Sequence, residues 1–176
     1  DLMDRLAAGV TPRQPEVEGL LRKAAERHPD RQLVGYQGAS DAAVGGPLVR
    51  SQVEAIFDAL KYDAKLTYIN SYLSLGEQKD QITQRVRLPA ASLALGGAAN
   101  CFDGSVLFAS LLEAASLNPA LVILPNHALV AWQKGSGRDE WDYLETTLIN
   151  SATFEQAVDI GRRKAEAFRK QAAAGN

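Results

Sequence analysis

Apolar residues recur at helical spacing in three segments of the chain and predict three amphipathic helices. The first covers residues 16–27 and ends just before Pro29. The second follows residues 32–47, a glycine-rich stretch that predicts a loop, and the third covers residues 152–173. The buried stripe of the second helix is expected at Val49, Val53, Ile56, Phe57 and Leu60.

A fourth helix is predicted to begin at about Cys101. Asn100 is a favourable N-cap, and Asp103 three residues later resembles the acidic half of a capping box. The helix ends at Leu117-Asn118-Pro119, and apolar residues cover most of its surface, which predicts a central and largely buried helix. These residues are Val106, Leu107, Phe108, Leu111, Leu112 and Ala114.

Three apolar runs of strand length follow the fourth helix, at residues 120–124, 127–133 and 140–144. They fit an antiparallel meander packed on that helix, and the fold class expected from the whole pattern is α+β. Residues 66–75 are compatible with either strand or helix. Residues 80–88 alternate as a short extended piece, and a helical turn is expected at 90–95.

Length and composition indicate one domain. A chain of 176 residues with 46% hydrophobic content is long enough for one buried core and short for two. We expect residues 1–14 to be a loosely packed lead-in, residues 15–174 to form the domain, and its chemistry to lie within about 84–150. The chain begins Asp1-Leu2-Met3, so we expect a piece of a longer protein, whose other domains are candidate partners.

The charge balance favours a protein, peptide or small molecule as partner. The formal charge is −2, with 19 basic and 21 acidic residues, and nothing in it predicts the basic surface that nucleic acid or an anionic membrane selects. No apolar run approaches the ~20 residues of a membrane span. The one cysteine excludes an internal disulfide and a thiolate zinc cage, which fits a reducing, cytoplasmic setting.

Three residues in the central stretch suggest nucleophilic chemistry. A helix N-terminus and a nearby imidazole favour the reactive thiolate of a cysteine, and a carboxylate can orient that imidazole. Cys101 begins the fourth helix, His127 opens a strand and Glu145 ends the next one. In adjacent antiparallel strands the start of one lies beside the end of the other, which brings His127 and Glu145 together. Asp142 is a competing acid, but it is expected nearer the other end of the hairpin.

The other histidine, His28, lies at the C-terminal edge of the first helix, where a capping role is the simpler interpretation. The basic residues of the last helix are interpreted as a solvated face. They are Arg162, Arg163, Lys164, Arg169 and Lys170.

The central stretch resembles the transglutaminase-like superfamily of papain-related cysteine enzymes, in its bacterial type. The resemblance lies in Cys101-Phe102-Asp103, the helix that follows, a strand, His127-Ala128, and Trp141 followed by Leu144-Glu145-Thr146-Thr147. It covers about residues 87–154, with weaker likeness at 84–89. It implies a papain-like core in which Cys101 is the nucleophile, His127 the base and acid, and Glu145 the residue that more often is aspartate. Asn126 stands where glycine is frequent, which a left-handed backbone would allow.

The resemblance implies acyl transfer at an amide bond of a protein or peptide, without a cofactor. Attack by water gives proteolysis or deamidation, and attack by an amine gives crosslinking; we expect hydrolysis. Gln84, Tyr68 and Asn100 are candidates for the oxyanion site or the cleft. The alternatives are a catalytically silent domain that binds a peptide or a neighbouring domain, and a small-molecule acyltransferase like the arylamine acetyltransferases. A metal hydrolase fits poorly, because neither histidine has metal-ligand spacing.

Overall fold

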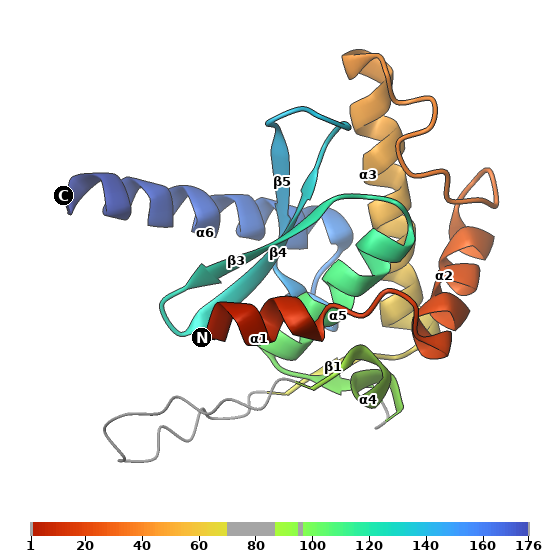
Figure 1. Ribbon diagram of the computed structural model, residues 1–176, viewed down its shortest axis with the longest axis horizontal. Coiled ribbons are helices and arrows are strands. Elements are labelled where there is room, and N and C mark those ends of the chain that lie inside the picture. The colour runs from red at the N-terminus through yellow and green to blue at the C-terminus, as the bar shows by residue number, and fades with distance from the viewer. Residues whose placement is uncertain (1, 70–86, 95–96, 176) are drawn as a thin grey trace.

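The computed structural model of the protein describes residues 2–69, 87–94 and 97–175 (Figure 1). Its helices are α1 (Leu2–Gly9), α2 (Pro15–Arg27), α3 (Ala42–Asp58), α4 (Pro89–Ala94), α5 (Cys101–Ala114) and α6 (Phe154–Ala174), with a π-helical segment η1 (Ala59–Asp63) and a 3-10 turn η2 (Thr146–Leu148). Its strands are β1 (Thr67–Tyr68), β2 (Ala98–Ala99), β3 (Pro119–Leu124), β4 (His127–Gln133) and β5 (Trp141–Leu144). The mixture of helices with a small antiparallel sheet agrees with the expected α+β class.

The meander predicted after the central helix is confirmed. Strands β3, β4 and β5 form a three-stranded antiparallel sheet in that order, with Leu124 opposite His127 and Val130 opposite Leu144. Successive side chains of a strand point to opposite faces. Strand β4 is central and buried on both faces of the sheet. Its even positions, such as Val130, join the core beside α5, whereas Leu129 packs on the α6 side. This double burial explains why β4 is apolar at almost every position.

Helix α5 is the central, buried helix that its apolar composition predicts. It begins at Cys101, where the Asn100 side chain accepts hydrogen bonds from the N–H groups of Phe102 and Asp103. Val106, Leu107 and other residues of its middle turns are shielded from solvent on all sides. Full burial of each such side chain favours folding by roughly 1.5–3 kcal/mol. The helix is therefore anchored along its length, and its capped first turn has a defined position.

Helices α2 and α3 pack together against α5 and complete the larger part of the core (Figure 1). The five positions predicted as the buried stripe of the second helix are all buried. The start of that helix differs from the prediction, since α3 begins at Ala42 within the segment expected to be a loop, and Pro47 lies inside it. Gly45 explains the difference: a Cβ there would meet the Ala39 carbonyl oxygen at 2.4 Å, so the glycine permits close backbone packing.

The expectation of a loosely packed lead-in at residues 1–14 was wrong in part. Residues 2–9 form α1, and the Leu6 side chain is 1% exposed. Leu6 packs with Phe102 and Val106 of α5 and with Ala128 of β4. The N-terminal segment therefore covers the apolar side of the first turns of α5, a tertiary contact that its short local pattern did not reveal.

A short parallel pair, β1 and β2, leads the chain into α5. Thr67 lies opposite Ala98 and Tyr68 opposite Ala99, immediately before the Asn100 cap. The segment at 66–75, left open between strand and helix, is a strand at Thr67–Tyr68, and the rest of it beyond residue 69 lies outside the described residues. The extended piece expected at 80–88 falls mostly outside them too. The helical turn expected at 90–95 is α4.

Helix α6 crosses the face of the sheet opposite α5 (Figure 1). It starts with a capping box between Thr153 and Gln156 and contacts β5 closely at Gly161. A Cβ at Gly161 would lie 2.8 Å from the Tyr143 carbonyl oxygen and 2.9 Å from the Leu144 nitrogen. The absence of a side chain at residue 161 thus lets the helix backbone rest directly on the strand. Within the described residues, the helices are too short or too polar for any of them to cross a membrane.

Gly161→Ala should destabilise the protein, because the added methyl group would push α6 away from the β5 backbone. The clash should lower the free energy of unfolding by up to about 3 kcal/mol, against a gain of about 1 kcal/mol that alanine normally brings inside a helix, which leaves a net loss of up to about 2 kcal/mol. Gly19→Ala in α2 is the matched control, since its nearest neighbour would be the end of the Arg22 side chain at 3.7 Å. Urea denaturation should show opposite signs for the two variants; equal effects would contradict this account of Gly161.

Candidate functional site

Cys101 lies at the first residue of α5 with its side chain partly exposed. The Asn100 cap fixes this position by binding the N–H groups of the two residues that follow Cys101. Free N–H groups and the helix dipole make the start of a helix favourable for negative charge. The half-buried Cys101 therefore lies at the electropositive end of the central helix.

His127 opens β4 directly after a two-residue turn, in which Asn126 has a φ of 58°. This is the left-handed backbone expected for asparagine at that position. The Nε2 atom of His127 lies 2.6 Å from the Oε2 atom of Glu145. Interaction with Cys101, followed by the hydrogen bond to Glu145, raises the pKa of His127 to about 9, so the thiol and the imidazole are close enough to influence each other. Because Nε2 faces Glu145, Nδ1 is the ring nitrogen that remains for another partner.

Glu145 follows β5 and is fully buried, with 0% of its side chain exposed. Its Oε1 atom accepts hydrogen bonds from the Thr147 hydroxyl at 2.7 Å and from the Thr147 backbone N–H at 3.2 Å. Burial alone would raise the pKa of Glu145, but hydrogen bonds from His127, Lys164 and Thr147 outweigh it and lower the pKa to about 2. Glu145 is thus held as a carboxylate.

Lys164 is the residue of this cluster that sequence reasoning missed. Its Nζ atom lies 2.5 Å from Glu145 Oε2 and 3.4 Å from His127 Nε2. The basic residues of α6 are exposed, as the interpretation of a solvated face expects, but Lys164 also reaches the buried Glu145. Arg162 likewise forms an ion pair with Asp142. The sequence signal that could have identified Lys164 is its position three residues after Gly161, on the same face of α6. That spacing is informative only when Gly161 is known to contact β5.

The three candidates for the oxyanion site have different positions. Tyr68 lies on β1 beside Ala99, and its pKa is raised by burial and then by the charges of Cys101 and Glu145, so its hydroxyl lies within electrostatic reach of the cluster. Asn150, which sequence reasoning also missed, accepts a hydrogen bond from the Tyr68 N–H at 2.7 Å and fixes that strand. The Oδ1 atom of Asn100 belongs to the helix cap. Gln84 lies outside the described residues.

The other acidic residues considered near the site have structural contacts. Asp103 is 1% exposed and accepts a hydrogen bond from the Arg87 N–H at 2.8 Å; burial raises its pKa. Asp142 lies opposite Trp132, away from His127 as predicted, and binds Arg162 at 2.6 Å through Oδ1. Neither acid competes with Glu145 for the imidazole.

His28 has the capping role expected of it. It ends α2, and its backbone N–H donates to the carbonyl oxygens of Ala24 and Ala25. Its ring is 4% exposed, with Nε2 at 2.9 Å from the Ser51 hydroxyl and Nδ1 accepting a hydrogen bond from Asp30. His28 thus stabilises the contact between α2 and α3 and has a structural role.

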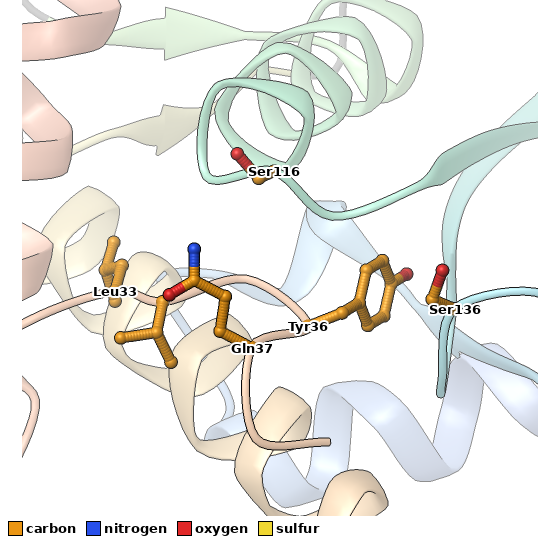
Figure 2. Close-up of a pocket in the computed structure, with 6 residues that line it drawn as sticks. Leu33, Tyr36, Gln37, Ser116 and Ser136 are labelled. Carbon is orange, nitrogen blue, oxygen red and sulfur yellow. The ribbon is translucent and has the colours of Figure 1, made fainter. Parts of the chain in front are cut away.

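A cavity of about 530 Å³ opens at the other end of α5 (Figure 2). Its lining residues include Leu33, Tyr36, Gln37, Ser116 and Ser136, with Ser136 beside Tyr36. Ser116 follows the C-terminal end of α5, whereas Cys101 begins that helix, so about 20 Å of helix separates the cavity from the thiol. Among the described residues, no group of three or more histidine, cysteine or acidic side chains is arranged to hold a metal ion.

Comparison of the chain with family models, with curated proteins and with solved structures found no match.

The pair of His127 and Glu145 should make stability depend on pH in a defined window. Glu145 has its pKa lowered from 4.5 to about 2, so its contribution is complete above pH 4.5 and is lost as pH falls through about 2. His127 has its pKa raised from 6.5 to about 9, so its contribution is complete below pH 6.5 and is lost as pH rises through about 9.

Glu145→Gln removes the carboxylate whose own pKa is lowered and which, after Cys101, is the second cause of the raised pKa of His127. The wild type should therefore exceed this variant in free energy of unfolding most strongly between pH 4.5 and 6.5. Urea denaturation across the pH range measures the difference. If the difference in free energy of unfolding stayed constant from about pH 3 to about pH 10, the ion pair would not be the cause of the pH dependence.

Proposed function

We propose that this protein is a cysteine-dependent acyl-transfer enzyme that acts on amide bonds of a protein or peptide, with a papain-like core of the transglutaminase-like type. One observation supports it above the others. A partly exposed cysteine at a helix N-terminus raises the pKa of an imidazole whose Nε2 atom lies 2.6 Å from a buried carboxylate. This is the arrangement of nucleophile, base and orienting acid that acyl transfer requires.

The reaction begins with transfer of the thiol proton from Cys101 to His127. The thiolate attacks the amide carbonyl carbon, and the carbonyl oxygen takes up the negative charge of the tetrahedral intermediate. As the C–N bond breaks, His127 donates its proton to the departing amine, and a thioester remains on Cys101. Water then attacks the thioester while His127 accepts one of its protons, which releases the acid and restores the thiol.

The oxyanion needs donors beside Cys101. The Asn100 cap takes up the N–H groups of Phe102 and Asp103, so the backbone N–H of Cys101 is the helix-start donor nearest the sulfur. The Tyr68 hydroxyl is the side-chain candidate, because it lies within electrostatic reach of Cys101. Asn100 contributes indirectly, by holding the first turn of α5 in position.

Hydrolysis is the outcome we favour, because the resemblance is to compact bacterial domains of peptidase type. A peptidase or amidase with one free thiol suits a reducing, cytoplasmic compartment. Transfer to an amine, or deamidation of a glutamine, uses the same thioester and the same three residues. The acceptor that resolves the thioester therefore decides among the three activities.

A peptide library incubated with wild type and with Cys101→Ala tests the proposal. Mass spectrometry should show cleavage by the wild type only, whereas a small mass increase would indicate deamidation and an added amine would indicate crosslinking. His127→Gln should lower the rate by about 10²–10⁴-fold, the usual contribution of a general acid–base residue. Identical product spectra from wild type and Cys101→Ala would contradict an enzymatic function.

Alkylation by iodoacetamide separates an enzyme from a silent binding domain. In an enzyme, alkylation of Cys101 should be fast near neutral pH, because the imidazolium of His127 stabilises the thiolate. His127→Gln should then slow it at pH 7. A wild-type rate equal to that of free cysteine would favour the silent domain.

A further inference from the structure

Glu145 Oε2 is shared by two donors that come from different elements. His127 approaches it from the start of β4 at 2.6 Å, and Lys164 approaches it from α6 at 2.5 Å. The carboxylate is fully buried, whereas the Lys164 side chain is 43% exposed, so the lysine reaches inward from the surface. The two donors lie 3.4 Å apart, close enough for the charge of one to act on the other.

The positive charge of Lys164 affects both the ionised Glu145 and the proton on His127. A buried carboxylate is stable as an ion only when it is paired and hydrogen-bonded. Without Lys164, the imidazolium of His127 would be the one cation hydrogen-bonded to Glu145 among the described residues. The carboxylate would then oppose each step in which His127 gives up its proton. With Lys164 in place, Glu145 is neutralised whether His127 is charged or neutral.

We propose that Lys164 is a positioning residue of the site, which neutralises Glu145 and thereby lets His127 alternate between its charged and neutral forms on an unchanged carboxylate. The inference rests on the proposed function, since this alternation is what acyl transfer asks of the histidine. Lys164 acts through Glu145 and carries no bond-making role of its own.

The position of Lys164 follows from the close contact between α6 and β5. Gly161 lies against the backbone of Tyr143 and Leu144, and Lys164 is three residues further along the same face of α6. Glu145 directly follows Leu144 along the chain. The contact between α6 and β5 therefore places Lys164 beside the carboxylate of Glu145.

Among the described residues, the ionisable groups that act on His127 are Cys101 from α5, Glu145 after β5 and Lys164 from α6. Tyr68 on β1 is linked to the same cluster, because burial and then the charges of Cys101 and Glu145 raise its pKa. Cys101 and Glu145 raise the pKa of His127, and the positive charge of Lys164 lowers it. Removal of that charge alone should therefore raise the pKa further.

The chain has two histidines, so an NMR titration of the imidazole signals can follow His127 directly, with His28 as an internal reference. In Lys164→Met the titration midpoint of His127 should rise by about one pH unit, the size expected for loss of a like charge in hydrogen-bond reach. Lys164→Gln, which keeps a hydrogen-bond donor without the charge, should give the same rise, and Lys164→Arg should restore the wild-type value.

Lys170→Met is the matched control, because Lys170 lies on the same helix, is 74% exposed and pairs with Glu166 at 2.7 Å. It should leave both histidine titrations unchanged. An unaltered His127 midpoint in Lys164→Met and Lys164→Gln would overturn the inference. The titration needs no substrate, so it can overturn the role of Lys164 while the peptide-library comparison supports the enzyme, and the reverse result is equally distinguishable.

Discussion

The buried carboxylate of Glu145 places the strongest requirement on this structure. It has no exposed surface, and a charge in that position is tolerated only if every lone pair has a donor. Thr147 supplies two hydrogen bonds to one oxygen, and His127 and Lys164 supply one each to the other. These donors belong to the turn after β5, the start of β4 and the surface of α6. One ionised group thus holds together three elements that are distant in the sequence.

The scaffold that meets this requirement is built on the two covered faces of β4. One face packs against α5, which supplies the thiol, and the other packs beneath α6, which supplies the lysine (Figure 1). Side chains alternate along a strand, and His127 at the first position of β4 lies at the end of the sheet, where Glu145 binds its ring and Cys101 is near enough to raise its pKa. The site therefore lies where two helices on opposite faces of one sheet come within reach of the same imidazole.

The chemistry that this arrangement favours depends on charge balance more than on any single residue. The electropositive start of α5 suits the thiolate, and the carboxylate suits the imidazolium. In the proposed mechanism, a carboxylate without a second cation would hold the proton on the imidazole too strongly for a base that has to release it. The proposed role of Lys164 resolves this conflict, and it does so with a residue that is partly open to solvent.

Local pattern determined much of this protein. The periods of apolar residues located the central helix and the meander, the Asn100 cap predicted the first turn of α5, and antiparallel pairing predicted that His127 and Glu145 would meet. These are properties of neighbouring residues or of adjacent strands. Tertiary structure alone decided that Gly45 and Pro47 lie in a helix, that Leu6 docks on α5, and that Lys164 among five basic residues of α6 reaches the carboxylate. Each of these depends on contacts between segments that are far apart in the sequence. The local spacing of apolar residues carries no information about such contacts.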